Sequence, residues 1–234
     1  TELEKAAIRV GGGVYRLGIG GLHSSEQTIS HFSDDEYVLV DRDVRSYYPA
    51  IIINNNIEPP HMTGVFLPKY KGHVDARIAA KAIGNTVVAD MGKILANGAG
   101  GKLNSKWSKF YYPQGFIHMT LTGQLSLLML IERLEQAGVT VISANTDGVG
   151  IRCRRDTTVL RDEIIARWEG DTKFETEEVE YRSIHINSVN TYIAVKTDNK
   201  VKLKGAYAPA GLMKNPTNEV CVQAVIAFLR DQVP

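Results

Sequence analysis

Two aspartates stand next to apolar segments, in positions where carboxylates can bind a metal ion. Asp43 follows the apolar run at 37–40, and Asp147 lies in an Asp-Gly turn between two β-rich runs. A strand end and a hairpin tip that bring such carboxylates together form an oxygen site suited to Mg²⁺ and to phosphoryl transfer through two ions about 3.5 to 4 Å apart. Taken separately, each has an ordinary explanation, because Asp147 can open a turn and Asp43 can cap a helix. Asp41 is a second candidate for the first position.

A third set of residues shares one face of a predicted helix between these aspartates. Lys93, Asn97 and Gly101 follow each other at steps of four, which places a cation, an amide and bare backbone on the same side. Such a face could hold a triphosphate. Arg77 and Lys81 add positive charge on the preceding helix, although a solvated helix surface explains them equally well.

The elements that must position these residues form a mixed α and β pattern. Strands are predicted by β-rich runs at 14–19, 37–40, 139–143, 149–153, 179–186, 191–195 and 201–203. Helices are predicted by periodic apolar residues at 118–137, 156–168 and 218–230, and as an antiparallel pair within 73–106 that breaks at Gly84 and Asn85. The helix at 118–137 is apolar on much of its circumference, so it is expected in the core. The polar stretch at 23–35 is predicted as a connection, and a short helical piece can follow Pro49.

Composition limits the remaining possibilities. With 234 residues, 44% of them hydrophobic, and a net charge of +1, the chain can form a packed core and carries no general basic character. Two cysteines are too few for a disulfide framework, and no apolar run approaches the length of a membrane span, so a soluble cytoplasmic protein is expected. The histidines show no metal-binding spacing.

Glycines gather in two clusters, at 11–21 and 92–101, and invite comparison with nucleotide-binding loops. A Walker loop would require glycine at Ala96 and a hydroxyl at Leu103, and a dinucleotide fingerprint would require glycine at His23 or Leu103. These loops are therefore excluded. The first cluster could lie against a template strand or could simply form strand turns.

Four motifs resemble those of family B DNA polymerases and occur in the order found in that family. Residues 43–52, DVRSYYPAII, are similar to motif A, D-x-x-S-(L/Y)-Y-P-S-I-I; 93–102 resembles motif B, K-x-x-x-N-(S/G)-x-(Y/F)-G; 144–148, ANTDG, resembles motif C, Y-x-D-T-D-(S/G); and 204–207, KGAY, resembles the later K-x-x-Y element. The sequences at 20–24 and 122–124 look most like those of phage members of the family.

The resemblance implies a role for each matching residue. Asp43 and Asp147 would be the catalytic carboxylates and, with the Val44 carbonyl, would bind two Mg²⁺ ions, for which Mn²⁺ could substitute. The nucleotide-binding residues would be Ser46 and Tyr47 through their amides, Tyr48 as the steric gate against ribonucleotides, Lys93 at the phosphates with Lys81 or Arg77, and Asn97. Lys204 and Tyr207 would grip the primer duplex.

The resemblance also implies a fold. We expect an α+β polymerase palm from 1–69 and 110–212, with a mainly antiparallel sheet backed by helices. A short helical fingers hairpin would span 70–109, and 213–234 would begin a truncated thumb or form a C-terminal helix. The exonuclease and the rest of the thumb are expected to be missing, as in a fragment of a phage protein that acts in the cytoplasm of a bacterial host.

The implied function is template-directed addition of a deoxynucleotide to a primer 3′ hydroxyl, with primer-template DNA and dNTP as partners. Two departures from the motifs favour an alternative, a DNA- or nucleotide-binding palm fragment with weak or no catalysis: Asn145 replaces the first carboxylate of motif C, and Gly100 replaces the aromatic residue of motif B. A reverse transcriptase or a primase-like polymerase is a further alternative. The turn at 46–49 and the lack of an Asp-Asp pair in motif C argue against it.

Overall fold

The computed structural model describes residues 7–209 and 218–231 and contains one large antiparallel sheet. Its strands are β1 (Ala7–Val10), β2 (Gly13–Leu17), β3 (Leu22–Ser24), β4 (Ile29–Phe32), β5 (Tyr37–Val44), β6 (Thr140–Asn145), β7 (Gly148–Arg154), β8 (Thr176–Ser188), β9 (Thr191–Lys196) and β10 (Val201–Leu203). They lie in the order β1-β2-β3-β6-β7-β5-β8-β9-β10, and β4 pairs with β8 beside this path.

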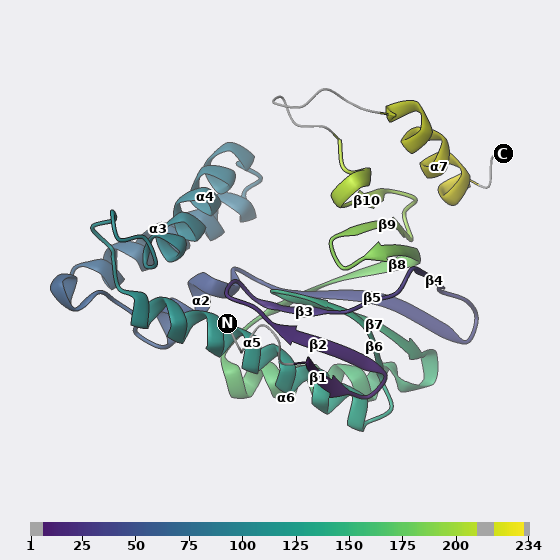
Figure 1. Cartoon of the computed structure of the whole chain (residues 1–234), viewed down its shortest axis with the longest axis horizontal. Coiled ribbons are helices and arrows are strands. Elements are labelled where there is room, and N and C mark those ends of the chain that lie inside the picture. Colours follow the sequence, from purple (N-terminus) through teal and green to yellow (C-terminus); the bar gives the residue numbers. More distant parts are fainter. Residues whose placement is uncertain (1–6, 210–217, 232–234) are drawn as a thin grey trace.

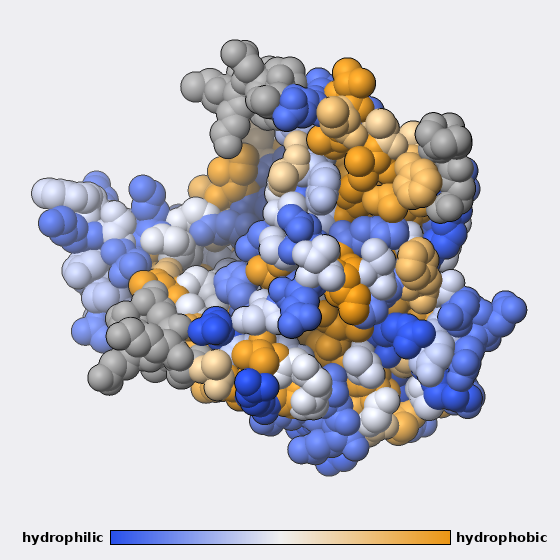
Figure 2. Space-filling view, turned by 45° about the vertical axis from the view of Figure 1, so that its right-hand side comes forward, coloured by the Kyte–Doolittle hydropathy of each residue, from blue (hydrophilic) through white to orange (hydrophobic). Residues whose placement is uncertain are grey.

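Six α-helices are present in the described part of the chain. They are α2 (Tyr47–Asn54), α3 (Phe66–Ala82), α4 (Thr86–Lys102), α5 (Pro113–Gln136), α6 (Thr158–Thr172) and α7 (Glu219–Asp231), with short 3₁₀ turns η1 (Pro60–Met62), η2 (Arg155–Thr157) and η3 (Gly205–Tyr207). Figure 1 shows α5 and α6 along one face of the sheet, and α3 and α4 projecting from one end as a helical hairpin. In the space-filling view this hairpin stands off from the body at the left (Figure 2). No helix within 7–209 and 218–231 is long and apolar enough to cross a membrane.

The core lies between the sheet and the helix α5. Leu127, Leu130, Ile131 and Leu134 are buried at successive helical turns of α5, as the apolar periodicity of this segment requires. The indole of Trp168 on α6 is fully buried and donates a hydrogen bond to the carbonyl of Ser126, at 2.8 Å. This contact fixes α6 to α5 and completes the helical layer behind the sheet.

The predicted mixed architecture with a mainly antiparallel sheet is confirmed, and several boundaries differ. The helix predicted to begin at residue 118 begins at Pro113, whose fixed φ suits the first turn of a helix, and its Leu125 is 54% exposed rather than part of the core. The helix predicted from 73 begins at Phe66, with Pro68 in its first turn. The stretch 23–35, predicted as a connection, contains β4 and most of β3, which pair at the sides of longer strands.

The segments proposed as palm, fingers and thumb are not tested by the fold and stay predictions. The helical hairpin does fall within the predicted fingers segment for most of its length, and the C-terminal helix predicted at 218–230 is present as α7. Residues 1–6 and 210–217, which include the end of the predicted palm at 212 and the start of the next segment at 213, lie outside the described residues.

Candidate active site

The two predicted metal-binding carboxylates lie near the end of β5 and in the turn that precedes the adjacent strand β7. β5 pairs with β7 so that Asp43 lies opposite Gly148, the residue that follows Asp147. The amide of Val44 donates a hydrogen bond to the carbonyl of Asp147, at 2.7 Å, and holds the turn between β6 and β7 against the end of β5. Both aspartates line a pocket of about 290 Å³ on the sheet.

Glycines of β7 lie opposite the two aspartates of β5. Asp41 and Asp43 are two residues apart on one face of this strand, and their cross-strand partners in β7 are Gly150 and Gly148. A side chain at Gly148 would overlap the Asp43 carboxylate and would come within 3.1 Å of the Arg42 carbonyl oxygen. Glycine at this position therefore leaves room for the Asp43 carboxylate.

Charge in this pocket is only partly compensated. Burial, followed by the charge of Asp41, raises the pKa of Asp43 to about 6, and the charge of Asp147 acts in the same direction while that of Lys202 opposes it. Asp147 is exposed at the mouth of the pocket, yet the surrounding protein atoms displace enough water to raise its pKa, against the charge of Lys204. Carboxylates that destabilise each other in this way are stabilised by a bound cation.

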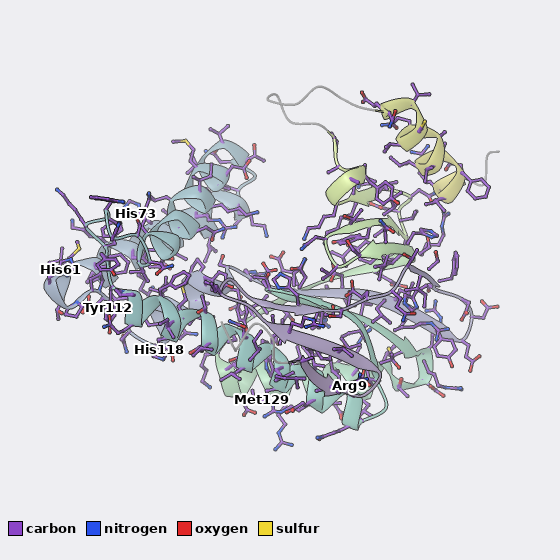
Figure 3. The ribbon with its side chains drawn as sticks, in the orientation of Figure 1. Arg9, His61, His73, Tyr112, His118 and Met129 are labelled. Carbon is purple, nitrogen blue, oxygen red and sulfur yellow. The ribbon has the colours of Figure 1, made fainter. Side chains whose placement is uncertain are left out.

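The donor atoms present fit a hard divalent cation. The carboxylates of Asp43 and Asp147 line the same pocket, as do those of Asp41 and Glu26, and oxygen ligands of this kind suit Mg²⁺. No group of three or more His, Cys, Asp or Glu side chains within the described ranges is arranged to hold a metal ion. Of the labelled histidines in Figure 3, His61, His73 and His118 come from η1, α3 and α5 and lie apart from one another. A cation bound here would therefore need carbonyl or amide oxygens in addition to carboxylates of this pocket.

Asn145, the residue at the predicted motif C position of a carboxylate, makes two side-chain hydrogen bonds. Its amide nitrogen donates to Oδ1 of Asn190 at 3.0 Å, and its Oδ1 accepts from the Thr146 hydroxyl at 3.1 Å. Sequence reasoning missed Asn190, which lies in the turn between β8 and β9 and has no local signature. Thr146 takes one acceptor position of the Asn145 amide oxygen, and the second lone pair stays available to a ligand.

Three further predicted residues lie where α2 begins. Ser46 precedes this helix in the left-handed conformation, at φ 50°, and its side chain does not cap the helix, so the first amides, including those of Tyr47 and Tyr48, have no partner within the helix. The Ser46 hydroxyl instead accepts a hydrogen bond from the guanidinium of Arg77 on α3. The Nε of Arg77 is buried without a hydrogen-bond partner among the described residues.

The two tyrosines of the predicted motif A are fixed by hydroxyl hydrogen bonds to glycine carbonyls. Tyr47 is buried and donates to Gly123 at 2.6 Å, and Tyr48 donates to Gly20. The rings stack with centroids 6.0 Å apart, and burial and the charge of Asp147 raise the pKa of Tyr48 to about 12. The first glycine cluster thus contacts the candidate steric gate, a contact that the sequence could not show.

The remaining predicted residues are less closely gathered. Lys81 on α3 is bound by Glu177 of β8, with Nζ 2.8 Å from Oε1. Lys93 and Asn97 are exposed on α4. Lys204, whose Nζ lies 5.9 Å from the centroid of the Tyr192 ring, lines the pocket with Asp147.

Tyr207 ends the turn η3, and its amide donates to the Lys204 carbonyl at 3.4 Å. Sequence reasoning also missed two charged residues that line the pocket, Glu26 and Lys202. Lys202 stands two residues before Lys204, but only tertiary structure places it beside Asp41. The pocket is therefore more highly charged than the motifs predict.

A comparison with solved structures relates this fold to a DNA polymerase. The structure of the family B DNA polymerase from the hyperthermophilic archaeon Pyrobaculum calidifontis is similar to this chain with a TM-score of 0.57 at 15% sequence identity, over 89% of this chain and 33% of that one. No family model and no curated protein matches the sequence. The chain spans about one third of the length of the polymerase that it matches.

The chain therefore has the fold of part of a family B DNA polymerase, which supports the predicted family at the level of architecture. The resemblance to phage members is not tested by this similarity and stays a prediction.

Proposed function

We propose that this chain is the catalytic core of a template-directed DNA polymerase, which transfers a deoxynucleotide to a primer 3′ hydroxyl. The observation that carries the proposal is the pairing of β5 with β7, which sets Asp43 beside the turn that bears Asp147 in a fold shared with a family B polymerase. Primer-template DNA and dNTP would be the partners.

In the proposed reaction the primer 3′ oxygen forms a bond to the α-phosphorus, and the bond from that phosphorus to the bridging oxygen breaks. The hydroxyl proton passes to solvent, and pyrophosphate leaves. Asp43, Asp147 and the Val44 carbonyl would hold two Mg²⁺ ions, which would activate the hydroxyl and neutralise charge on the phosphates when bound.

The proposed triphosphate site lies at the start of α2. The free amides of this helix end are donors that a phosphate would satisfy, and the Arg77 guanidinium, which donates to the Ser46 hydroxyl, adds positive charge beside them. Lys93 and Asn97, exposed on α4, would contact the nucleotide from the hairpin. The Tyr48 ring, held by Gly20, would block a ribose 2′ hydroxyl, and Lys204 and Tyr207 would hold the primer strand.

The alternative proposal, a palm that binds DNA or nucleotide without turnover, is favoured by the hydrogen bonds that occupy Asn145 and by the ion pair that occupies Lys81. Titration of Mg²⁺ or Mn²⁺ against a primer-template and dNTP separates the two. The proposed polymerase extends the primer, and Asp147→Asn lowers the rate by at least a hundredfold. Binding of DNA without extension by the unsubstituted chain would support the alternative, and equal extension by both proteins would refute the site assignment.

A further inference from the structure

A lysine on the edge strand β10 lines the pocket of the proposed metal site. The Nζ of Lys202, on β10, lies 2.9 Å from Oδ2 of Asp41 and 3.6 Å from Oδ2 of Asp43. The side chains of Lys202 and Asp41 are 31% and 17% exposed, so this is a partly desolvated ion pair. The Lys202 ammonium therefore lies beside Asp43, one of the two carboxylates that the proposed function assigns to a bound cation.

Asp41 is itself held in place. Its Oδ2 accepts one hydrogen bond from the Lys202 ammonium and another from the Tyr181 hydroxyl, at 3.4 Å. The strand places Asp41 and Asp43 on the same face, over glycines, so the two carboxylates share one ammonium. The closer contact is with Asp41, which draws the ammonium away from Asp43.

The position of this ammonium governs how strongly a divalent cation can bind. A positive charge within 4 Å of a ligand carboxylate in a partly desolvated pocket opposes a second cation by Coulomb repulsion and competes for the same oxygen. If the ammonium pairs with Asp41, the Asp43 carboxylate stays available. If Asp41 loses its charge, Asp43 becomes the remaining acidic partner within reach of Lys202 in this ion-pair network.

We propose that Asp41 and Lys202 are positioning residues that set the divalent-cation affinity of the Asp43–Asp147 site: Lys202 weakens cation binding, and Asp41 limits that competition by holding its ammonium. This inference rests on the proposed function, because it takes Asp43 and Asp147 as the cation ligands. It predicts that removing the charge of Lys202 raises the cation affinity, whereas removing the charge of Asp41 lowers it. A merely structural ion pair would give loss of binding, or no change, for both.

The test is direct Mn²⁺ binding to the full chain, measured from the electron paramagnetic resonance signal of free Mn²⁺ at neutral pH and low salt, without DNA or nucleotide. Lys202→Met is expected to lower the Kd at least tenfold and Asp41→Asn to raise it at least tenfold. Lys202→Arg, which keeps the charge, should stay within threefold of the unsubstituted chain. Lys200→Met is the matched control, since it removes the same charge from an exposed pair with Asp198 on the same hairpin, and should also stay within threefold.

Asp147→Asn separates failure of this inference from failure of the proposed site. If Asp147→Asn leaves Mn²⁺ binding unchanged, the proposed cation site and the inference both fall. If Asp147→Asn weakens binding but Lys202→Met does not tighten it, only the inference is overturned. Thermal unfolding of each variant establishes that it is folded, and if Asp41→Asn is unfolded the two Lys202 variants decide the question alone.

Discussion

At the scale of single residues, the site is defined by carboxylates whose charge the protein leaves partly uncompensated. Asp43 lies over Gly148 beside Asp147, and burial together with the charges of Asp41 and Asp147 raises its pKa to about 6. A folded-state pKa above the value of 3.8 expected in the unfolded chain means that the charged form opposes folding. The stability of the metal-free protein should report this directly.

The sign of that effect can be predicted. Between about pH 4 and pH 7 the folded chain binds more protons at Asp43 than the unfolded chain, so the contribution of Asp43 to stability falls as the pH rises through this window. Asp43→Asn removes the contribution. Relative to the variant, the free energy of unfolding of the unsubstituted protein should fall by about 1 kcal/mol between pH 4.5 and pH 7.5. This value is reduced for solvent screening, because the Asp43 side chain is 49% exposed.

Urea unfolding in the presence of EDTA, at both pH values, measures this difference. If the difference in unfolding free energy between the two proteins does not change with pH, or favours the unsubstituted protein at pH 7.5, the pKa of Asp43 is not raised in the folded protein.

At the scale of elements, the helical hairpin is tied to the sheet by charged contacts that a nucleotide would have to rearrange. Lys81 of α3 pairs with Glu177 of β8, and Arg45 pairs with the same carboxylate at 3.0 Å. The hydrogen bond from Lys81 lowers the pKa of Glu177, which shows that this ion pair stabilises the charged carboxylate. If Lys81 binds the triphosphate, Glu177 is its competitor.

Glu177→Gln should therefore lower the KM for dNTP two- to fivefold while kcat stays within twofold, because Lys81 becomes available to the phosphates before the chemical step. Both side chains of this pair are more than 40% exposed, so stability should change by less than about 1 kcal/mol. Steady-state incorporation of one nucleotide at low salt measures the KM.

Asp75→Asn provides the control for this effect, since it breaks the exposed pair with Lys71 on the same helix. An equal fall in KM for Asp75→Asn would assign the effect to overall charge, and a rise in KM for Glu177→Gln would contradict the competition.

The elements themselves could be predicted wherever the signal is local. The Asp147-Gly148 pair predicts a hairpin here, and the hairpin of β6 and β7 is present, but its turn residues are Thr146 and Asp147, with Thr146 at φ 54°, and Gly148 begins β7. The apolar period predicts most of α5. The short strands β3 and β4 could not be predicted, because their pairing comes from neighbouring long strands rather than from their own polar sequences. The ion pairs of Glu175, just before β8, and Glu177, on β8, with Arg45 and Lys81 could not be predicted either, because they join segments that are far apart in the sequence.

At the scale of the whole molecule, the candidate site depends on strand register, which sequence spacing does not contain. The motifs predict that Asp43 and Asp147 act together, but the opposition of Asp41 and Asp43 to Gly150 and Gly148 follows only from the pairing of β5 with β7. The approach of Lys202 likewise requires β8, β9 and β10 to be assembled. The family resemblance supplies the proposed roles, and the fold supplies the neighbours that modify them.

The most direct test of the central claim is single-nucleotide incorporation on primer-templates that present each of the four templating bases. We predict incorporation of the complementary dNTP in every case, dependent on Mg²⁺ and at least a hundredfold slower in both Asp43→Asn and Asp147→Asn. Incorporation that ignores the templating base, or that survives either substitution, would contradict the account.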